Sequence, residues 1–103
     1  MIIVRHGERT DYADPTWVAR QKQSADGGRP WDPPLTARGR LQAVACGERL
    51  MRECASLGVP APSVVCTSPF TRCVETAEGI GSATGVATLC VDGALAEDLS
   101  EKW

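Results

Sequence analysis

One histidine and three arginines of this 103-residue chain stand within five positions after short apolar segments. Arg5, His6 and Arg9 follow the β-branched run at residues 2–4, and Arg72 follows a second apolar stretch. Guanidinium groups suit phosphate because their planar fork donates two parallel hydrogen bonds and stays charged at any working pH. An imidazole beside such a cluster can attack phosphorus and carry the phosphoryl group covalently. These residue types therefore predict phosphoryl-transfer chemistry.

A carboxylic acid is the next requirement, because a leaving alkoxide or phenoxide needs a proton. Glu97 follows the last apolar stretch of the chain and is our candidate for this general acid. It stands in an acidic stretch with Asp92, Asp98 and Glu101, any of which could be merely a solvated charge. Glu8 is interpreted as a structural or rim-lining residue rather than a catalytic one.

The strands that must position these residues are predicted at residues 2–4, 63–67 and 86–91, where β-branched or apolar residues run together. Two predicted helices separate them, and this alternation is typical of a right-handed parallel α/β unit. We therefore predict one domain over residues 1–103, with an α/β fold and a parallel sheet in a three-layer sandwich. Ligands of such sheets bind outside the carboxyl ends of the strands, where the predicted site residues stand.

The helices between these strands have recognisable ends. Thr36 is typical of an N-cap, and Gly58 of a C-terminal stop, so a first helix is predicted between them. A second helix is predicted to start at Ser68-Pro69, with serine as cap and proline at the first helical position, and to end at Gly85. Residues 10–34 show no sustained period and are predicted to form a long loop, which is either functional or disordered.

Composition and net charge restrict the classes of binding partner that we expect for this chain. Eleven basic and thirteen acidic side chains give a net charge of −2, whereas a nucleic-acid or anionic-membrane partner would require a basic excess. The apolar run Met1–Val4 is far shorter than a signal peptide or a membrane span. Five cysteines are an odd number, and no CxxC spacing occurs, so we predict buried thiols in a reducing, cytoplasmic setting and no metal site. Neither nucleic acid nor membrane is predicted as a partner.

Three motif blocks, taken in order, resemble the histidine phosphatase, or phosphoglycerate mutase-like, superfamily. They are Val4-Arg5-His6-Gly7-Glu8-Arg9, Pro34-Leu35-Thr36 with Gly39 and Gln42-Ala43, and Thr67-Ser68-Pro69 with Arg72 and Thr76-Ala77. The resemblance covers nearly the whole chain, from Ile2 to about Glu97. Within the superfamily, Arg-His-Gly-Glu-Arg with Asp11 and Trp17 downstream is most similar to the eukaryotic branch related to protein-tyrosine phosphatases.

The resemblance implies phosphomonoester hydrolysis through a phosphohistidine on His6, with a phosphorylated small molecule or phosphoprotein as substrate. Arg5, Arg9 and Arg72 would bind phosphate, and Glu97 aligns with the family's acid in a Leu-x-Glu context. No metal, nucleotide or other cofactor is implied. A mutase-type phosphoryl transfer is a further alternative, against which the branch-specific Arg9 argues mildly.

One departure from the family is clear. The family carries a second histidine on a later strand, and this sequence contains His6 alone. The superfamily domain is also longer, so residues 1–103 are expected to be its N-terminal portion and the sandwich to be incomplete. A catalytically inactive phosphate-binding or interaction fragment is therefore the alternative to an enzyme, and a product that does not fold independently is a third possibility. An exposed parallel sheet edge would allow self-association.

Overall fold

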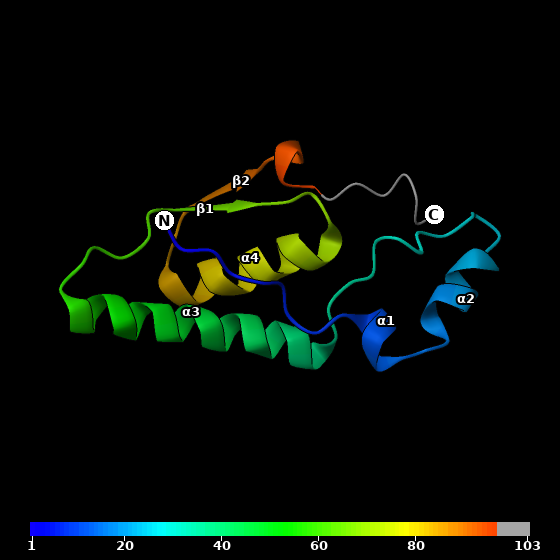
Figure 1. The fold of residues 1–103 in the computed structure, drawn as a ribbon, viewed down its shortest axis with the longest axis horizontal. Helices are drawn as coiled ribbons and strands as arrows, with labels where there is room; N and C mark the ends of the chain where they lie inside the picture. Colours follow the sequence, from blue (N-terminus) through cyan, green and yellow to red (C-terminus); the bar gives the residue numbers. More distant parts are fainter. Residues whose placement is uncertain (97–103) are drawn as a thin grey trace.

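A computed structural model describes residues 1–96 of the chain. Its elements, in chain order, are α1 (Thr10–Ala13), α2 (Trp17–Lys22), α3 (Ala37–Leu57), β1 (Val64–Thr67), α4 (Thr71–Thr84), β2 (Thr88–Val91) and the 3-10 turn η1 (Gly93–Leu95). Within these residues, no helix is both long and apolar enough to cross a membrane. Figure 1 shows the molecule as an elongated body, with α3 along one side and the strands along the other.

The sheet consists of β1 and β2, which pair in parallel from Val64 opposite Thr88 to Thr67 opposite Val91. Helix α4 connects the two strands and packs against both of them, and α3 packs on α4 (Figure 1). The predicted α/β class with a parallel sheet is confirmed. Residues 1–96 thus contain the sheet, the helix against it and the helix packed on that helix.

The first predicted strand is wrong. Residues 2–4 form no strand in the structure, and Ile3 is 85% exposed rather than buried. In Figure 1 this N-terminal segment passes the helices as an irregular chain. A β-branched run becomes a buried parallel strand only when neighbouring strands supply hydrogen bonds and helices cover both faces. Neither β1 nor β2 pairs with residues 2–4. These residues therefore have no partner strand within the described part of the chain, despite their β-branched composition.

Helix α3 has the bounds that its capping residues predict. The Thr36 hydroxyl accepts a hydrogen bond from the Gly39 amide at 2.9 Å, and Gly58 ends the helix in the left-handed conformation at φ 67°. Leu57, the last residue of α3, is 71% exposed although it is apolar. The reason is that Gly47 already lies against Ala83, one residue before α4 ends, so the last turn of α3 extends beyond its partner helix.

Thr36→Ala should destabilise the chain by about 1 kcal/mol, because it removes the side-chain cap of α3. The same hydroxyl donates to Glu8 Oε1 at 2.8 Å, so the substitution also removes one hydrogen bond to the residue that follows Gly7. Thr36→Ser keeps both hydrogen bonds and is the matched control. Urea unfolding of both variants measures the difference, and equal midpoints would contradict the capping role.

The α3–α4 contact depends on small residues. A Cβ at Gly47 would lie 2.7 Å from the Cβ of Ala83, and one at Gly79 would lie 2.7 Å from the Cβ of Ala43. Such distances leave no room for a side chain, so glycine permits the two helices to approach closely. The buried hydrophobic side chains of the described residues are Trp17, Leu35, Ala43, Cys54, Ala77 and Ile80, with Pro33 fully buried.

Helix α4 starts later than predicted. Its first residue is Thr71, and its N-cap, Phe70, makes no side-chain capping hydrogen bond. Ser68 is therefore not the cap, and its hydroxyl only reaches the Phe70 amide at 3.5 Å. The first-turn amide of Thr71 instead donates at 2.7 Å to the carboxylate of Asp32, which lies in the segment before α3. The predicted stop at Gly85 is confirmed, with φ 76°.

The segment at residues 10–34 is more ordered than the predicted loop, because it contains the short helices α1 and α2. Trp17 of α2 is buried, with 8% of its surface exposed. Exposed carboxylates close its turns. Hydrogen bonds from Thr16, together with Arg20, lower the pKa of Asp14, and hydrogen bonds from Ser24 and the Gly28 amide lower that of Asp26. These two carboxyls therefore stay ionised to a lower pH than usual.

Candidate functional site

The segment carrying Arg5 and His6 lies against the N-terminal turn of α3. The Thr36 amide donates to Glu8 O at 3.0 Å, and an antiparallel bridge joins Arg9 to Leu35. A Cβ at Gly7 would lie 2.5 Å from the carbonyl oxygen of Gly39. Glycine is therefore required at position 7 by the close approach of two backbones, and this contact fixes the backbone of the preceding histidine.

A second set of hydrogen bonds joins the same segment to α4. The Gly7 amide donates to Thr76 Oγ1 at 3.1 Å, and that hydroxyl donates to the carbonyl oxygen of Arg72 at 2.7 Å. Arg72 is 4% exposed, and its guanidinium carbon lies 4.4 Å from the centre of the Phe70 ring. The structure thus brings the histidine segment and the arginine of α4 together through one buried threonine.

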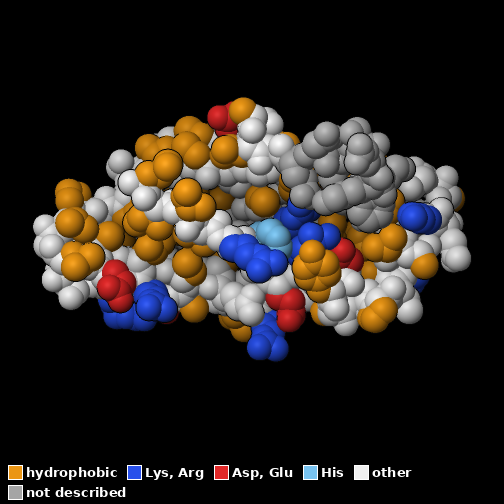
Figure 2. Space-filling view, in the orientation of Figure 1, with side chains coloured by type: hydrophobic (Ala, Val, Ile, Leu, Met, Phe, Trp, Pro, Cys, Tyr) orange, Lys and Arg blue, Asp and Glu red, His pale blue; other side chains and the backbone are white. Residues whose placement is uncertain are grey.

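His6 is half-buried, and its Nδ1 lies 2.8 Å from the carbonyl oxygen of Gly7. A carbonyl oxygen can only accept, so this contact assigns the proton to Nδ1 and leaves the lone pair on Nε2. Figure 2 shows the single histidine, in pale blue, at the surface with basic side chains on both sides of it. The arrangement supplies a nucleophilic nitrogen in a positively charged setting.

The other two predicted arginines differ from each other. Arg5 is exposed. Arg9 is mostly buried and donates from Nε and Nη2 to the carboxylate of Asp11 at 3.0 and 2.8 Å, and from Nη1 to the Tyr12 hydroxyl at 3.0 Å. Its guanidinium carbon also lies 4.2 Å from the centre of the Tyr12 ring. A phosphate at Arg9 would therefore share this guanidinium with Asp11, and its role as a ligand stays a prediction.

Acidic residues around the site hold the backbone. Glu8 Oε1 accepts from the Thr36 hydroxyl, consistent with the structural role predicted for it. Glu75, which the sequence reasoning missed, accepts from the Leu35 amide at 2.9 Å and pairs with Arg40 at 2.5 Å. Asp92 accepts from the Ala94 amide at 2.9 Å and so caps η1. The predicted acid Glu97 lies outside the described residues.

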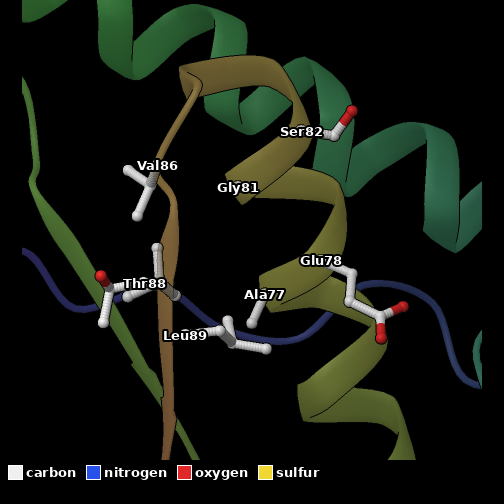
Figure 3. Close-up of a pocket in the computed structure, with 8 residues that line it drawn as sticks. Ala77, Glu78, Gly81, Ser82, Val86, Thr88 and Leu89 are labelled. Atoms are coloured by element: carbon white, nitrogen blue, oxygen red, sulfur yellow. The ribbon is translucent and has the colours of Figure 1, made fainter.

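Two hollows open on the surface, and the predicted site residues that the structure describes line neither of them. One, of about 260 Å³, lies between α4 and β2 and is lined by Ala77, Gly81, Val86 and Leu89 among others, with Glu78 as its charged residue (Figure 3). Its apolar and acidic lining does not suit phosphate. The other, of about 650 Å³, is lined by polar and apolar residues of the segment 17–34 and by Thr71, the neighbour of Arg72.

The thiols are less buried than predicted. Cys54 is buried, but Cys66 and Cys90 are exposed cross-strand partners on β1 and β2, because residues 1–96 leave that part of the sheet uncovered. The pKa of the Cys66 thiol is raised, mainly by desolvation and to a smaller extent by the neighbouring Cys90. The thiol therefore stays protonated at neutral pH. It is therefore not poised as a nucleophile. Within residues 1–96, no group of His, Cys, Asp and Glu could hold a metal ion.

Gly39→Ala should destabilise the chain by about 2 kcal/mol, because the added Cβ would overlap the backbone of Glu8. Gly81→Ala is the control, since a Cβ there has its nearest neighbour at 3.8 Å and lies inside α4, where alanine favours the helix. Thermal unfolding should show a lower midpoint for the first variant and an unchanged or higher one for the second. Similar midpoints for the two would refute the close contact.

Comparison with known proteins agrees with this geometry. The profile of the family described as the histidine phosphatase superfamily (branch 1) matches residues 1–103. A mycobacterial glucosyl-3-phosphoglycerate phosphatase, solved in complex with VO3, is 31% identical with a TM-score of 0.63, and the match covers 94% of this chain and 38% of that one. A protein described as mycobacterial hydrolase 1 is 29% identical with a TM-score of 0.59, covering 90% and 36%. No curated protein sequence matches, and the chain spans somewhat over a third of the length of these structures.

Proposed function

Because the chain belongs to the histidine phosphatase superfamily (branch 1), we propose that it hydrolyses phosphomonoesters through a phosphohistidine on His6. The observation that carries this proposal is the orientation of the imidazole. Nδ1 is bound to the Gly7 carbonyl oxygen, so Nε2 is the free nucleophile, and hydrogen bonds through Thr76 tie this segment to the helix of Arg72.

In the first step His6 Nε2 attacks phosphorus while the bond to the leaving oxygen breaks. Arg5 and Arg72 bind the non-bridging oxygens, and Glu97 gives its proton to the leaving alkoxide or phenoxide. In the second step water attacks the phosphohistidine and gives a proton to the Glu97 carboxylate, while the P–N bond breaks, which releases inorganic phosphate and restores both the imidazole and the acid. The role of Glu97 and the additional phosphate contact of Arg9 rest on the family resemblance.

Burial makes Arg72 the main contributor to charge stabilisation. A guanidinium withdrawn from water interacts with a phosphoryl group through a lower effective dielectric than an exposed one such as Arg5. Its position in the first turn of α4 adds the amides and the positive end of the helix dipole. Preorganised charge of this kind is usually the largest catalytic contribution.

The solved neighbours support an anionic ligand and a phosphorylated substrate. One is a glucosyl-3-phosphoglycerate phosphatase in complex with VO3. We extend to this chain the class of substrate, a phosphomonoester, without choosing among sugar phosphates, other metabolites and phosphoproteins. The proposed reaction uses neither a metal nor a nucleotide.

A second candidate, a module that binds phosphate without turnover, is favoured by one observation. The sequence contains a single histidine, so the second imidazole that the family resemblance implies would have to be supplied from outside residues 1–103. The arginines and the α4 N-terminus would still hold an anion, because their geometry depends on residues that the chain contains.

The test is turnover of p-nitrophenyl phosphate by the full chain, combined with mass spectrometry of an alkaline quench. Hydrolysis with a transient phosphoryl adduct on the peptide containing His6 supports the enzyme, and alkaline conditions are chosen because phosphohistidine is acid-labile. Orthovanadate binding without turnover or adduct would instead support the binding module. A chain that neither hydrolyses the ester nor binds orthovanadate overturns both.

A further inference from the structure

Asp32 forms a link between the 17–34 segment and α4 that the proposed reaction does not use. Its side chain is 3% exposed. The carboxylate accepts from the Thr71 amide at 2.7 Å and from the Thr71 hydroxyl at 2.8 Å, and it pairs with the exposed guanidinium of Arg29 at 3.1 Å. A buried carboxylate with two donors on one residue 39 positions away is a specific attachment rather than a solvated charge.

The attachment falls at the start of α4, directly before Arg72. The helix has no side-chain cap of its own, since Phe70 at the N-cap supplies none. Asp32 takes over that function from another segment, and its negative charge complements the positive end of the helix. The position of the Arg72 backbone therefore depends on Asp32, a residue of the 17–34 segment.

Arg72 is held from its other side as well. Its carbonyl oxygen accepts from Thr76, whose hydroxyl accepts from the Gly7 amide next to His6. The Arg72 backbone thus lies between two attachments, one from Asp32 through Thr71 and one from the histidine segment through Thr76. Loss of the first attachment would free the first turn of α4 to shift, and misplacement of the Arg72 guanidinium by about 1 Å is enough to weaken a positioned contact strongly.

We infer that Asp32 is a positioning residue, which sets the first turn of α4 and thereby the guanidinium of Arg72. The inference rests on the proposed function for the identity of the ligand, an oxyanion. It also predicts that a change in the 17–34 segment, which lines the adjoining hollow together with Thr71, is transmitted to the arginine.

The experiment compares Asp32→Ala and Asp32→Asn with the matched control Asp26→Asn. Asp26 lies in the same segment and lines the same hollow, but its carboxylate binds Ser24 and Gly28 instead of α4. Two readouts are taken on the full chain. One is the affinity for orthovanadate, and the other is the Nε–Hε NMR resonance of Arg72, identified by its loss in Arg72→Lys.

Asp32→Ala should bind orthovanadate about tenfold more weakly and shift the Arg72 resonance, whereas Asp26→Asn changes neither. Asp32→Asn should lie between them, because an amide can still pair with both Thr71 groups but lacks the charge. In an Arg72→Ala background, Asp32→Ala should cause no further loss of affinity, since a positioning residue acts through the group that it positions.

An unmoved Arg72 resonance in folded Asp32→Ala would overturn the inference, as would a full loss of affinity that persists in the Arg72→Ala background. If Asp32→Ala does not fold, Asp32→Asn and Thr71→Val decide the question by the same resonance, because each leaves one or more of the contacts in place. If the unaltered chain binds no orthovanadate, the proposed function fails, and the Arg72 resonance still tests the positioning by itself.

Discussion

His6→Ala should lower the rate of p-nitrophenyl phosphate hydrolysis by about 10⁴-fold or more and abolish the phosphoryl adduct. The variant lacks the only imidazole of the sequence, and the structure orients that imidazole with Nδ1 bound to the Gly7 carbonyl oxygen. Steady-state kinetics and mass spectrometry of the quenched reaction measure the two effects.

Binding separates this effect from misfolding. His6→Ala should still bind orthovanadate, because Asp32 binds Thr71 in the first turn of α4 and Thr76 binds the Arg72 carbonyl oxygen, and neither contact involves the imidazole. Arg52→Ala, an exposed position on α3, is the control and should keep both activity and adduct. Hydrolysis by His6→Ala at the rate of the unaltered chain would show that another group is the nucleophile.

The elements that the sequence predicts best are those with local signals. Helix α3 is bounded by Thr36 and Gly58, whose effects act within one turn, and both ends occur where they were predicted. The stop of α4 at Gly85 is of the same kind. A strand at residues 2–4 would depend instead on pairing with strands that are distant in the sequence, and the composition of residues 2–4 does not reveal whether such partners are present. Ile3 is exposed for that reason.

The start of α4 illustrates the same limit. Ser68-Pro69 has the composition of a helix start, but the cap is the carboxylate of Asp32. Local composition cannot reveal that choice, because the competition is decided by a contact across 39 positions.

The candidate site, like the fold, could be predicted only in part from the sequence. The rule that ligands bind at the carboxyl ends of parallel strands predicts His6 and Arg72 in one region. Residues 2–4 form no strand, but hydrogen bonds through Thr76 still join the segments of His6 and Arg72. The state of Arg9 was not foreseen, although its partner Asp11 is only two positions away. The sequence predicts Arg9 as a phosphate-binding residue, and that prediction left out the carboxylate of Asp11, which binds the same guanidinium.

Arg72→Lys should weaken orthovanadate binding about 10²-fold and lower kcat/KM for p-nitrophenyl phosphate at least as much. Lysine keeps the charge but loses the planar fork, so two parallel hydrogen bonds to the anion become one. The position is 4% exposed, and water cannot take the place of the lost donor as it could at the surface. The substitution also removes the contact between the planar guanidinium and the Phe70 ring.

Arg49→Lys is the matched control for this substitution. Arg49 lies on α3 with a side chain that is 76% exposed, and its ion pair with Glu53 is 3.9 Å long, so the change should leave binding and turnover unaltered. Isothermal titration with orthovanadate compares the two variants after circular dichroism has shown that both are folded. Equal affinities would mean that the anion is held by the exposed Arg5 and by backbone amides instead. In that event the buried arginine serves the packing of α4 rather than the recognition of phosphate.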